Sequence, residues 1–181
     1  WTEGDYITAA FTGSATHYID FRIKSGAEGN TAEFIGEVPD GTYTSVTAIY
    51  PGVENGKDGI ILERADTDHI FMSASSKTRM EVKDSTSISL TFRQIMHKIE
   101  FAITIADGFD RYAGQDIGTV SIQMTAEDQS GIIRFLETAS YNLKKNTLTR
   151  LSESDMILTE AEGSLGTASF DCSTQIFPLT G

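Results

Sequence analysis

The sequence predicts an all-β protein, and three observations lead to that expectation. Apolar and polar residues alternate in many short runs, which is the period of a strand with one buried face. Dipeptides typical of turns, such as Gly29-Asn30, Asn55-Gly56 and Asp107-Gly108, separate these runs. No segment keeps the 3.6-residue period of an amphipathic helix. Many short strands joined by turns are typical of a sandwich or a barrel.

The expected strands are the runs with strict alternation, in which every second side chain lies on one face. These runs cover residues 19–24, 46–50, 88–92, 99–105, 120–124 and 168–172. Asp40-Gly41, between Glu37-Val38 and Tyr43-Thr44, predicts a hairpin turn. For residues 152–162 we expect a loop or one short helix, because Ser152 and Asp155 have capping-box spacing but the apolar stripe is weak.

Composition and charge exclude several classes of function. The 181 residues include 14 Lys and Arg against 26 Asp and Glu, so the net charge is −12. Such a surface repels phosphate backbones, so we expect no nucleic-acid partner. No apolar run is long enough for a membrane-spanning helix. The polar stretch 83–87 predicts a boundary between two β domains, residues 1–84 and 85–181.

Residues able to carry chemistry are present, but they are not spaced as a known site. The histidines are His17, His69 and His97, and none has a motif partner. Asp66 and Asp68 share a face of an extended segment beside His69, which suits either a cation site or, more simply, a solvated loop. The single Cys172 excludes an intrachain disulfide and is expected to be a small core residue.

Two further sets of side chains have alternative interpretations. The acidic pairs Glu127-Asp128 and Glu153-Asp155 resemble catalytic carboxylates, but such pairs are expected in any chain this acidic. Aromatic side chains could stack on sugar rings or belong to the core, and the candidates are Trp1, Tyr6, Tyr18, Tyr112 and Tyr141. The sequence therefore predicts no enzyme, no cofactor and no catalytic, cofactor-binding or metal residue.

Four elements, in order along the chain, resemble the fimbrillin-like family of bacterial fimbriae. Trp1–Ile7 is similar to the W-x-x-G-D-x-I element of that family, and Thr47–Pro51 to its A-x-Y-P strand end. The stretch from Asp68 through Met72-Ser73-Ala74 to Ile99 resembles Met-x-Ala followed by L-x-F-x-H-x-x-x-K-I, although Gln94 stands where the family has His. Gln175–Pro178 is similar to a late apolar-apolar-Pro element. Gln94 indicates a divergent member.

The resemblance implies two transthyretin-like Greek-key β-sandwich lobes, with the first and last strands missing from 1–84 and 85–181 respectively. It also implies export through the outer membrane as a lipoprotein precursor, and a structural subunit or tip adhesin on the cell surface. Its partners would be other fimbrial subunits, joined by exchange of a β-strand, and a host or bacterial surface glycan or protein. The alternative is a surface carbohydrate-binding β-sandwich module. A sandwich-fold hydrolase is a third reading.

Overall fold

The computed structural model describes residues 1–54, 57–64, 70–104, 115–128, 131–165 and 169–177. All regular secondary-structure elements within these ranges are β-strands, which confirms the all-β prediction. The strands are β1 (Tyr6–Gly13), β2 (Thr16–Ser25), β3 (Glu33–Ile35), β4 (Gly41–Tyr50), β5 (Ile60–Glu63), β6 (Met72–Ser76), β7 (Met80–Val82), β8 (Arg93–Gln94), β9 (His97–Thr104), β10 (Gln115–Met124), β11 (Ala126–Asp128), β12 (Gly131–Ile133), β13 (Phe135–Asn142), β14 (Thr147–Ser154), β15 (Ile157–Leu165) and β16 (Ser169–Ile176).

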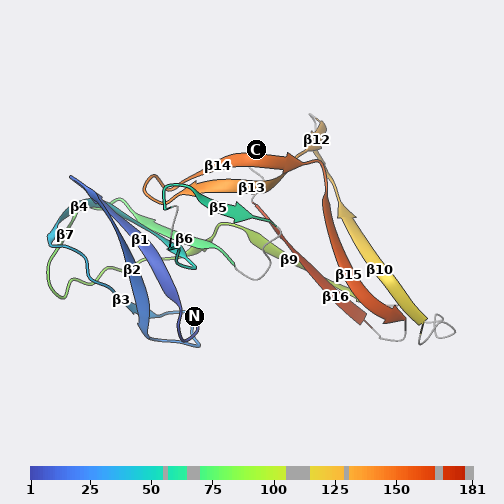
Figure 1. Ribbon diagram of the computed structural model, residues 1–181, viewed down its shortest axis with the longest axis horizontal. Coiled ribbons are helices and arrows are strands. Elements are labelled where there is room, and N and C mark those ends of the chain that lie inside the picture. Colours follow the sequence, from blue (N-terminus) through green and yellow to red (C-terminus); the bar gives the residue numbers. More distant parts are fainter. Residues whose placement is uncertain (55–56, 65–69, 105–114, 129–130, 166–168, 178–181) are drawn as a thin grey trace.

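A seven-stranded antiparallel sheet contains the first part of the chain. Its order is β3-β2-β1-β4-β6-β8, and β7 pairs with the beginning of β4. Further along the chain, β14-β13-β5 form a three-stranded sheet, while β16-β9, β10-β15 and β11-β12 are two-stranded ribbons. Figure 1 shows the large sheet at one end of the molecule and the ribbons β16-β9 and β10-β15 extending toward the other end.

The two central strands of the large sheet are buried on both faces. Ile7 to Phe11 in β1 and Val46 to Ile49 in β4 are continuously buried, unlike the alternating strand β2. One face packs Ala10 and Ile49 against Leu62 and Tyr141 of the three-stranded sheet, which makes a sandwich. The opposite face has a core of its own, defined by the residues Ile7, Ala9, Phe11, Tyr43, Val46, Ala48 and Val82. We call this second face the groove face.

Several strand predictions are confirmed by the pairing. Residues 19–24 lie in β2, 46–50 in β4, 99–104 in β9 and 120–124 in β10. Cys172 lies opposite Phe101 in the β16-β9 ribbon, but its side chain is outside the described residues. No described residue belongs to a helix long and apolar enough to cross a membrane.

The predicted hairpin at Asp40-Gly41 is wrong. β4 begins at Gly41, but residues 37–38 form no strand and β3 pairs with β2 instead. Pro39 cannot donate a main-chain hydrogen bond to a partner strand. Its carbonyl accepts a 2.8 Å hydrogen bond from the Tyr43 hydroxyl, which fixes this stretch beside β4 in another way.

The expected loop or short helix at 152–162 is also wrong, because the segment is divided between β14 and β15. β14 pairs with β13, and β15 pairs with β10. A tight turn joins the two strands: the Ser154 hydroxyl donates to the Met156 carbonyl at 2.8 Å and accepts from the Met156 amide at 3.3 Å. Pairing with distant strands therefore overrides the local capping signal.

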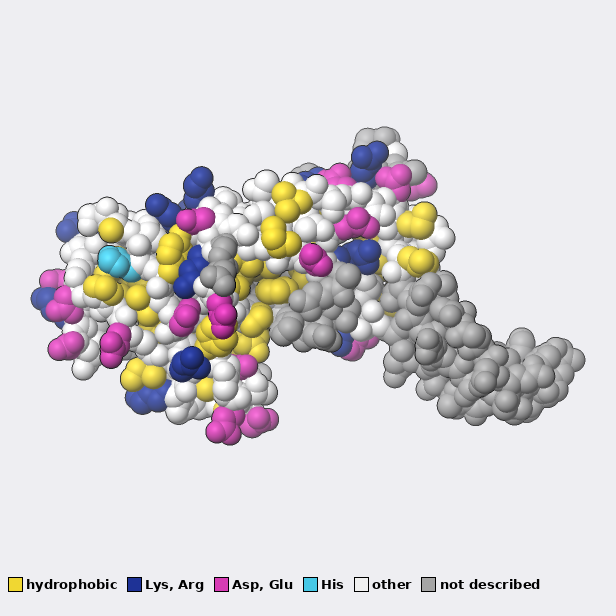
Figure 2. Space-filling view, viewed as in Figure 1, with side chains coloured by type: hydrophobic (Ala, Val, Ile, Leu, Met, Phe, Trp, Pro, Cys, Tyr) yellow, Lys and Arg dark blue, Asp and Glu magenta, His cyan; other side chains and the backbone are white. Residues whose placement is uncertain are grey.

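Hydrophobic side chains also remain exposed outside the cores. Ile61, Leu148 and Leu151 are about half exposed at 51%, 40% and 54%, and they lie on the three-stranded sheet. Figure 2 shows hydrophobic side chains gathered over the middle of one face of the molecule. Single exposed side chains of this kind are common on soluble proteins and need no function.

Candidate functional site

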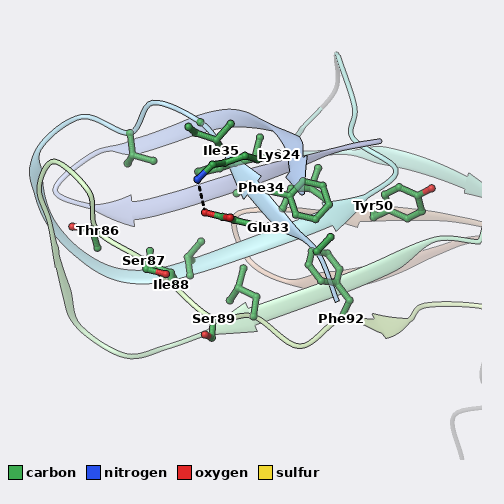
Figure 3. Close-up of a pocket in the computed structure, with 18 of the residues that line it drawn as sticks. Lys24, Glu33, Phe34, Ile35, Tyr50, Thr86, Ser87, Ile88, Ser89 and Phe92 are labelled. Atoms are coloured by element: carbon green, nitrogen blue, oxygen red, sulfur yellow. Dashed lines mark hydrogen bonds and ion pairs between the residues drawn. The ribbon is translucent and has the colours of Figure 1, made fainter. Parts of the chain in front are cut away.

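A groove with a volume of about 1410 Å³ lies on the groove face of the seven-stranded sheet. Ile7, Ala9 and Phe11 of β1 and Val46 of β4 line its floor. Two stretches that are distant in the sequence form its walls, residues 29–38 on one side and 83–92 on the other. Figure 3 shows Phe34 and Ile35 on one wall and Ile88 and Phe92 on the other.

The wall formed by residues 83–92 has the side-chain pattern of a strand but lacks its pairing. Ile88, Leu90 and Phe92 are half-buried and pack against the groove-face core, while Ser89 and Thr91 are exposed. The predicted alternation of buried and exposed side chains is therefore confirmed, but residues 88–92 do not pair as a strand. No described residue donates to or accepts from the main chain of residues 87–91.

The opposite wall has a similar open edge. β3 pairs with β2 on one side only, and residues 36–38 make no main-chain hydrogen bond with any described residue. The groove therefore has an apolar floor and lies between two stretches, residues 36–38 and 87–91, whose main-chain N–H and C=O groups have no partner among the described residues. Such edges are templates for pairing with a further strand.

Trp1 lies at one end of the groove. Its indole ring meets Phe34, Tyr50 and Phe92 edge to face, with ring centroids 4.9, 5.0 and 5.4 Å away. Its amino group donates to the Gly29 carbonyl at 3.1 Å, and its own carbonyl accepts from the amide of Glu28 at 2.6 Å. These contacts connect β3, the end of β4 and the 83–92 wall.

Charged groups are confined to the rim of the groove. Lys24 and Glu33 form a 2.8 Å ion pair, and the hydrogen bond from the Lys24 ammonium lowers the pKa of the Glu33 carboxyl. Next to Trp1, the Tyr50 hydroxyl donates to Asp5 at 3.0 Å. Burial, followed by the hydrogen bond and the charge of Asp5, raises the pKa of Tyr50 to about 12. The floor itself is apolar.

The two histidines within the described residues, His17 and His97, lie in different sheets. His17 in β2 lies edge-on to the ring of Tyr43, with centroids 6.0 Å apart. His97 is exposed in β9, opposite Ile176. His69, with Asp66 and Asp68, lies outside the described residues, so the candidate cation site there is not tested.

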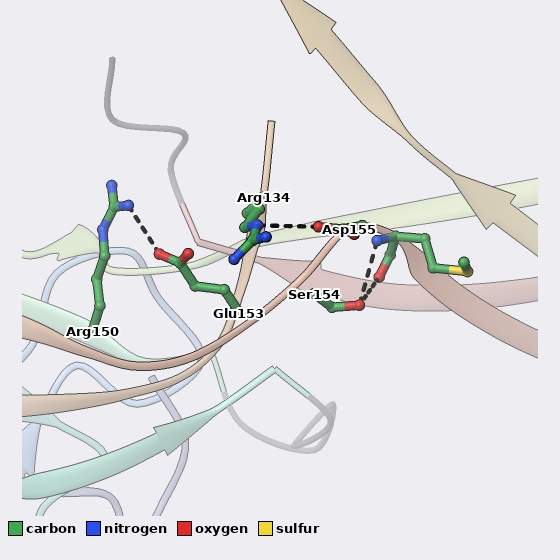
Figure 4. Close-up of polar contacts among 6 residues, drawn as sticks. Arg134, Arg150, Glu153, Ser154 and Asp155 are labelled. Atoms are coloured by element: carbon green, nitrogen blue, oxygen red, sulfur yellow. Dashed lines mark hydrogen bonds and ion pairs between the residues drawn. The ribbon is translucent and has the colours of Figure 1, made fainter. Parts of the chain in front are cut away.

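Of the two acidic pairs, Glu153 and Asp155 are engaged in ion pairs on the surface. Glu153 accepts from Arg150 at 3.0 Å, and Asp155 binds Arg134 at 3.2 Å, so the two carboxylates are directed to different partners (Figure 4). Glu127 is exposed in the short strand β11. Within the described part of the chain, no group of three His, Cys, Asp or Glu side chains is placed to hold a metal ion.

The candidate sugar-stacking aromatics are also dispersed. Tyr6 lies under the Arg22 guanidinium at 5.9 Å, and Tyr18 donates to Asp58, with burial as the largest cause that raises the pKa of Tyr18 to about 12. Tyr141 is buried, and Tyr112 lies outside the described residues. No aromatic side chain whose burial is described is exposed, so none of them offers a flat, open ring to a sugar.

Comparison with known proteins supports the fold. No family model and no curated protein matches the chain. Among solved structures, it is similar to the crystal structure of a "putative cell adhesion protein" from Bacteroides uniformis ATCC 8492. The two superpose with a TM-score of 0.60 over 98% of this chain and 70% of the other, at 19% sequence identity. A likeness at this identity shows a shared all-β fold.

Proposed function

We propose that the chain is a non-enzymatic fimbrial subunit or tip adhesin that polymerises by accepting a β-strand from another subunit. The observation that carries this proposal is the apolar groove between the unpaired stretches 36–38 and 87–91. An incoming strand would gain main-chain hydrogen bonds from these edges and would bury alternate side chains on the groove floor. Strand exchange of this kind is what the resemblance to the fimbrillin-like family implies.

The dimensions of the open edge suit a short strand. Residues 87–91 extend over roughly 17 Å at about 3.3 Å per residue, which is close to the usual length of a strand. Ile88, Leu90 and Phe92 already direct alternate apolar side chains toward the sheet. An inserted strand with the same alternation would fix its register, because a slip of one residue would turn its apolar side chains to water.

The solved neighbour adds support at a coarser level. It is described as a cell adhesion protein, and a surface adhesion role for this chain agrees with that description. In the proposal, the chain is exported through the outer membrane as a lipoprotein precursor and acts on the cell surface. The division into lobes 1–84 and 85–181 remains part of the proposal.

An assembly assay with a matched pair of variants tests strand insertion. The full-length precursor is treated with a trypsin-like protease, run unboiled on an SDS gel and examined by negative-stain microscopy. Leu90→Asp places a charge in the groove and is expected to abolish the SDS-resistant ladder and the filaments. Thr91→Asp places the same charge on the outward side of the adjacent residue and is expected to leave both intact.

Circular dichroism and thermal unfolding show whether each variant is folded. If folded Leu90→Asp polymerised like the wild type, the groove would not be the acceptor of the strand. If the wild-type precursor stayed monomeric after cleavage, strand exchange would be excluded and the carbohydrate-binding alternative would gain weight. That alternative currently lacks an exposed aromatic platform among the described residues.

A further inference from the structure

The positive side chains of this acidic protein are unevenly distributed. Many Lys and Arg residues form ion pairs with Asp or Glu, namely Lys24, Lys57, Arg64, Lys83, Lys98, Arg134 and Arg150. Arg22 lies over the ring of Tyr6. Besides Arg22, the cationic side chains that have no ion pair within the described part of the chain are Lys77, Arg79, Arg93, Lys144 and Lys145. We call these residues the basic patch.

The members of the basic patch come from three places in the sequence that the fold brings together. Lys77 and Arg79 follow the end of β6, Arg93 lies in β8, and Lys144 and Lys145 lie in the turn between β13 and β14. All are exposed. β6 and β8 are paired strands in one sheet, so Arg93, opposite Ser73, and Lys77 and Arg79, beyond the other end of β6, border the same short strand.

Direct contacts join the β13-β14 turn to the same region. The side-chain amide of Asn146, next to Lys145, donates to the Ser75 hydroxyl of β6 at 3.1 Å. Across the β6-β8 pair, Ser73 lies opposite Arg93. A second hydrogen bond, on the core side, fixes the side chain of Asn146, because the buried Tyr141 hydroxyl donates to its carbonyl oxygen at 2.6 Å.

The sequence around the patch lacks carboxylates. Residues 70–80, 85–99 and 138–152 contain no Asp or Glu, although the chain has 26 of them. The sequence neighbours of the basic patch therefore add no negative charge that would oppose its positive field. In a molecule with a net charge of −12, such a cluster of cations is suited to attract an anion.

A polar pocket with a volume of about 480 Å³ lies between these elements. Its lining combines the hydroxyl side chains of Ser73, Ser75, Ser76, Ser89 and Thr91 with Arg93 and Asn146. No carboxylate and no aromatic ring lines it. Hydroxyl and amide groups both donate and accept hydrogen bonds, as the hydroxyls of a sugar do, and a guanidinium binds carboxylate or sulfate in a bidentate manner.

We propose that the basic patch and its hydroxyl-lined pocket bind an acidic saccharide, a glycan that carries carboxylate or sulfate groups. The pocket volume is in the range of sites that hold a small ligand. The cations at its border would hold the acidic groups, while Ser75 and Asn146 would meet the sugar hydroxyls. The inference rests on the surface adhesion role proposed above, but it does not depend on strand insertion into the groove.

Binding is measured by isothermal titration calorimetry on the unprocessed full chain, with heparin-derived and polygalacturonate hexasaccharides. These probes distinguish sulfate from carboxylate recognition, and a neutral dextran hexasaccharide is the reference. We expect at least one acidic probe to bind, with an affinity that falls as salt increases, and dextran not to bind. Lys144→Ser/Lys145→Ser is expected to weaken binding at least tenfold. The control Lys98→Ser/Arg134→Ser removes the same charge elsewhere and should leave the affinity unchanged.

Ser75→Ala distinguishes a saccharide site from a general polyanion site. It should weaken saccharide binding severalfold while leaving the binding of inorganic polyphosphate unchanged. Equal loss in the control double variant, or no binding of either acidic hexasaccharide, would overturn the proposal. So would equal loss of polyphosphate and saccharide binding in Ser75→Ala. Failure here with normal protease-dependent assembly would leave strand exchange standing, and the reverse result would leave the saccharide site standing.

Discussion

At the scale of single residues, Trp1 contacts several separate parts of the structure, whereas the described His, Asp and Glu residues considered for a chemical role do not. Its ring touches β3, the end of β4 and the 83–92 wall, which are separated widely in the sequence. Its main chain is bound to Glu28 and Gly29, so the ring is held from a second direction. This residue therefore joins the two walls at one end of the groove.

Replacement of this ring should be costly to stability. Trp1→Ala removes three edge-to-face contacts and part of a half-buried apolar surface, so we expect the free energy of unfolding to fall by about 2–3 kcal/mol. Trp1→Phe keeps an aromatic ring at the site and should recover most of that loss. Urea unfolding followed by circular dichroism measures both variants. An equally small change in both would mean that the ring contributes little to the fold.

At the scale of elements, residues 87–91 alternate half-buried and exposed side chains as a strand does. Their main chain, however, is not paired with another strand. Apolar alternation reports which face of a segment is buried, and here that face was predicted correctly. Pairing depends on a neighbour at the right distance, which periodicity cannot report. The same limit explains residues 152–162, where pairing with β13 and β10 decided the structure.

Hydrogen exchange should separate this stretch from the true strands. The amides of residues 87–91 have no acceptor among the described residues, so we expect them to exchange quickly despite the half-buried side chains of Ile88 and Leu90. Residues 46–49 of β4, paired with β1 and β6, should exchange slowly. Mass spectrometry on peptic fragments gives both rates. Comparable protection of the two stretches would contradict an open edge.

At the scale of the whole molecule, the three-stranded sheet and the β16-β9 ribbon meet at Arg64. Its amide donates to the Glu137 carbonyl at 2.8 Å, which joins the end of β5 to β13. Its guanidinium lies 3.8 Å from the Glu137 carboxylate and donates to the Thr174 hydroxyl of β16 at 3.3 Å. Arg64 therefore connects the three-stranded sheet with the β16-β9 ribbon.

Loss of this connection should weaken the fold as a whole. Arg64→Ala is expected to lower the free energy of unfolding by about 1–2 kcal/mol, because the contacts are long and Glu137 is partly exposed. Arg64→Lys should recover less than half, since one ammonium cannot reach both partners. Arg134→Ala, which breaks the exposed pair with Asp155, should change stability by less than about 0.5 kcal/mol. Denaturant unfolding measures all three, and equal effects of the two alanine variants would contradict the assigned role.

The sequence could predict several of the strands, but not the groove or the basic patch. The strands β2, β4, β9 and β10 follow from local alternation, which needs no knowledge of the neighbours. The groove needs the approach of residues 29–38 to 83–92, and the basic patch needs the approach of the β13-β14 turn to β6, seen in the contact of Asn146 with Ser75, which only folding creates. The acid-free stretches around the patch were visible in the sequence, and they were the signal that could have indicated it.

The position of Trp1 has an optical consequence. It is the only tryptophan in the chain, so selectively excited fluorescence comes from one end of the groove and from nowhere else. Its emission depends on how much water reaches the half-buried indole, and in the proposed strand exchange an incoming strand beside Phe34 and Phe92 would displace that water. The protein thus contains an intrinsic probe with which the filling of its own groove can be followed in real time, without a chemical label.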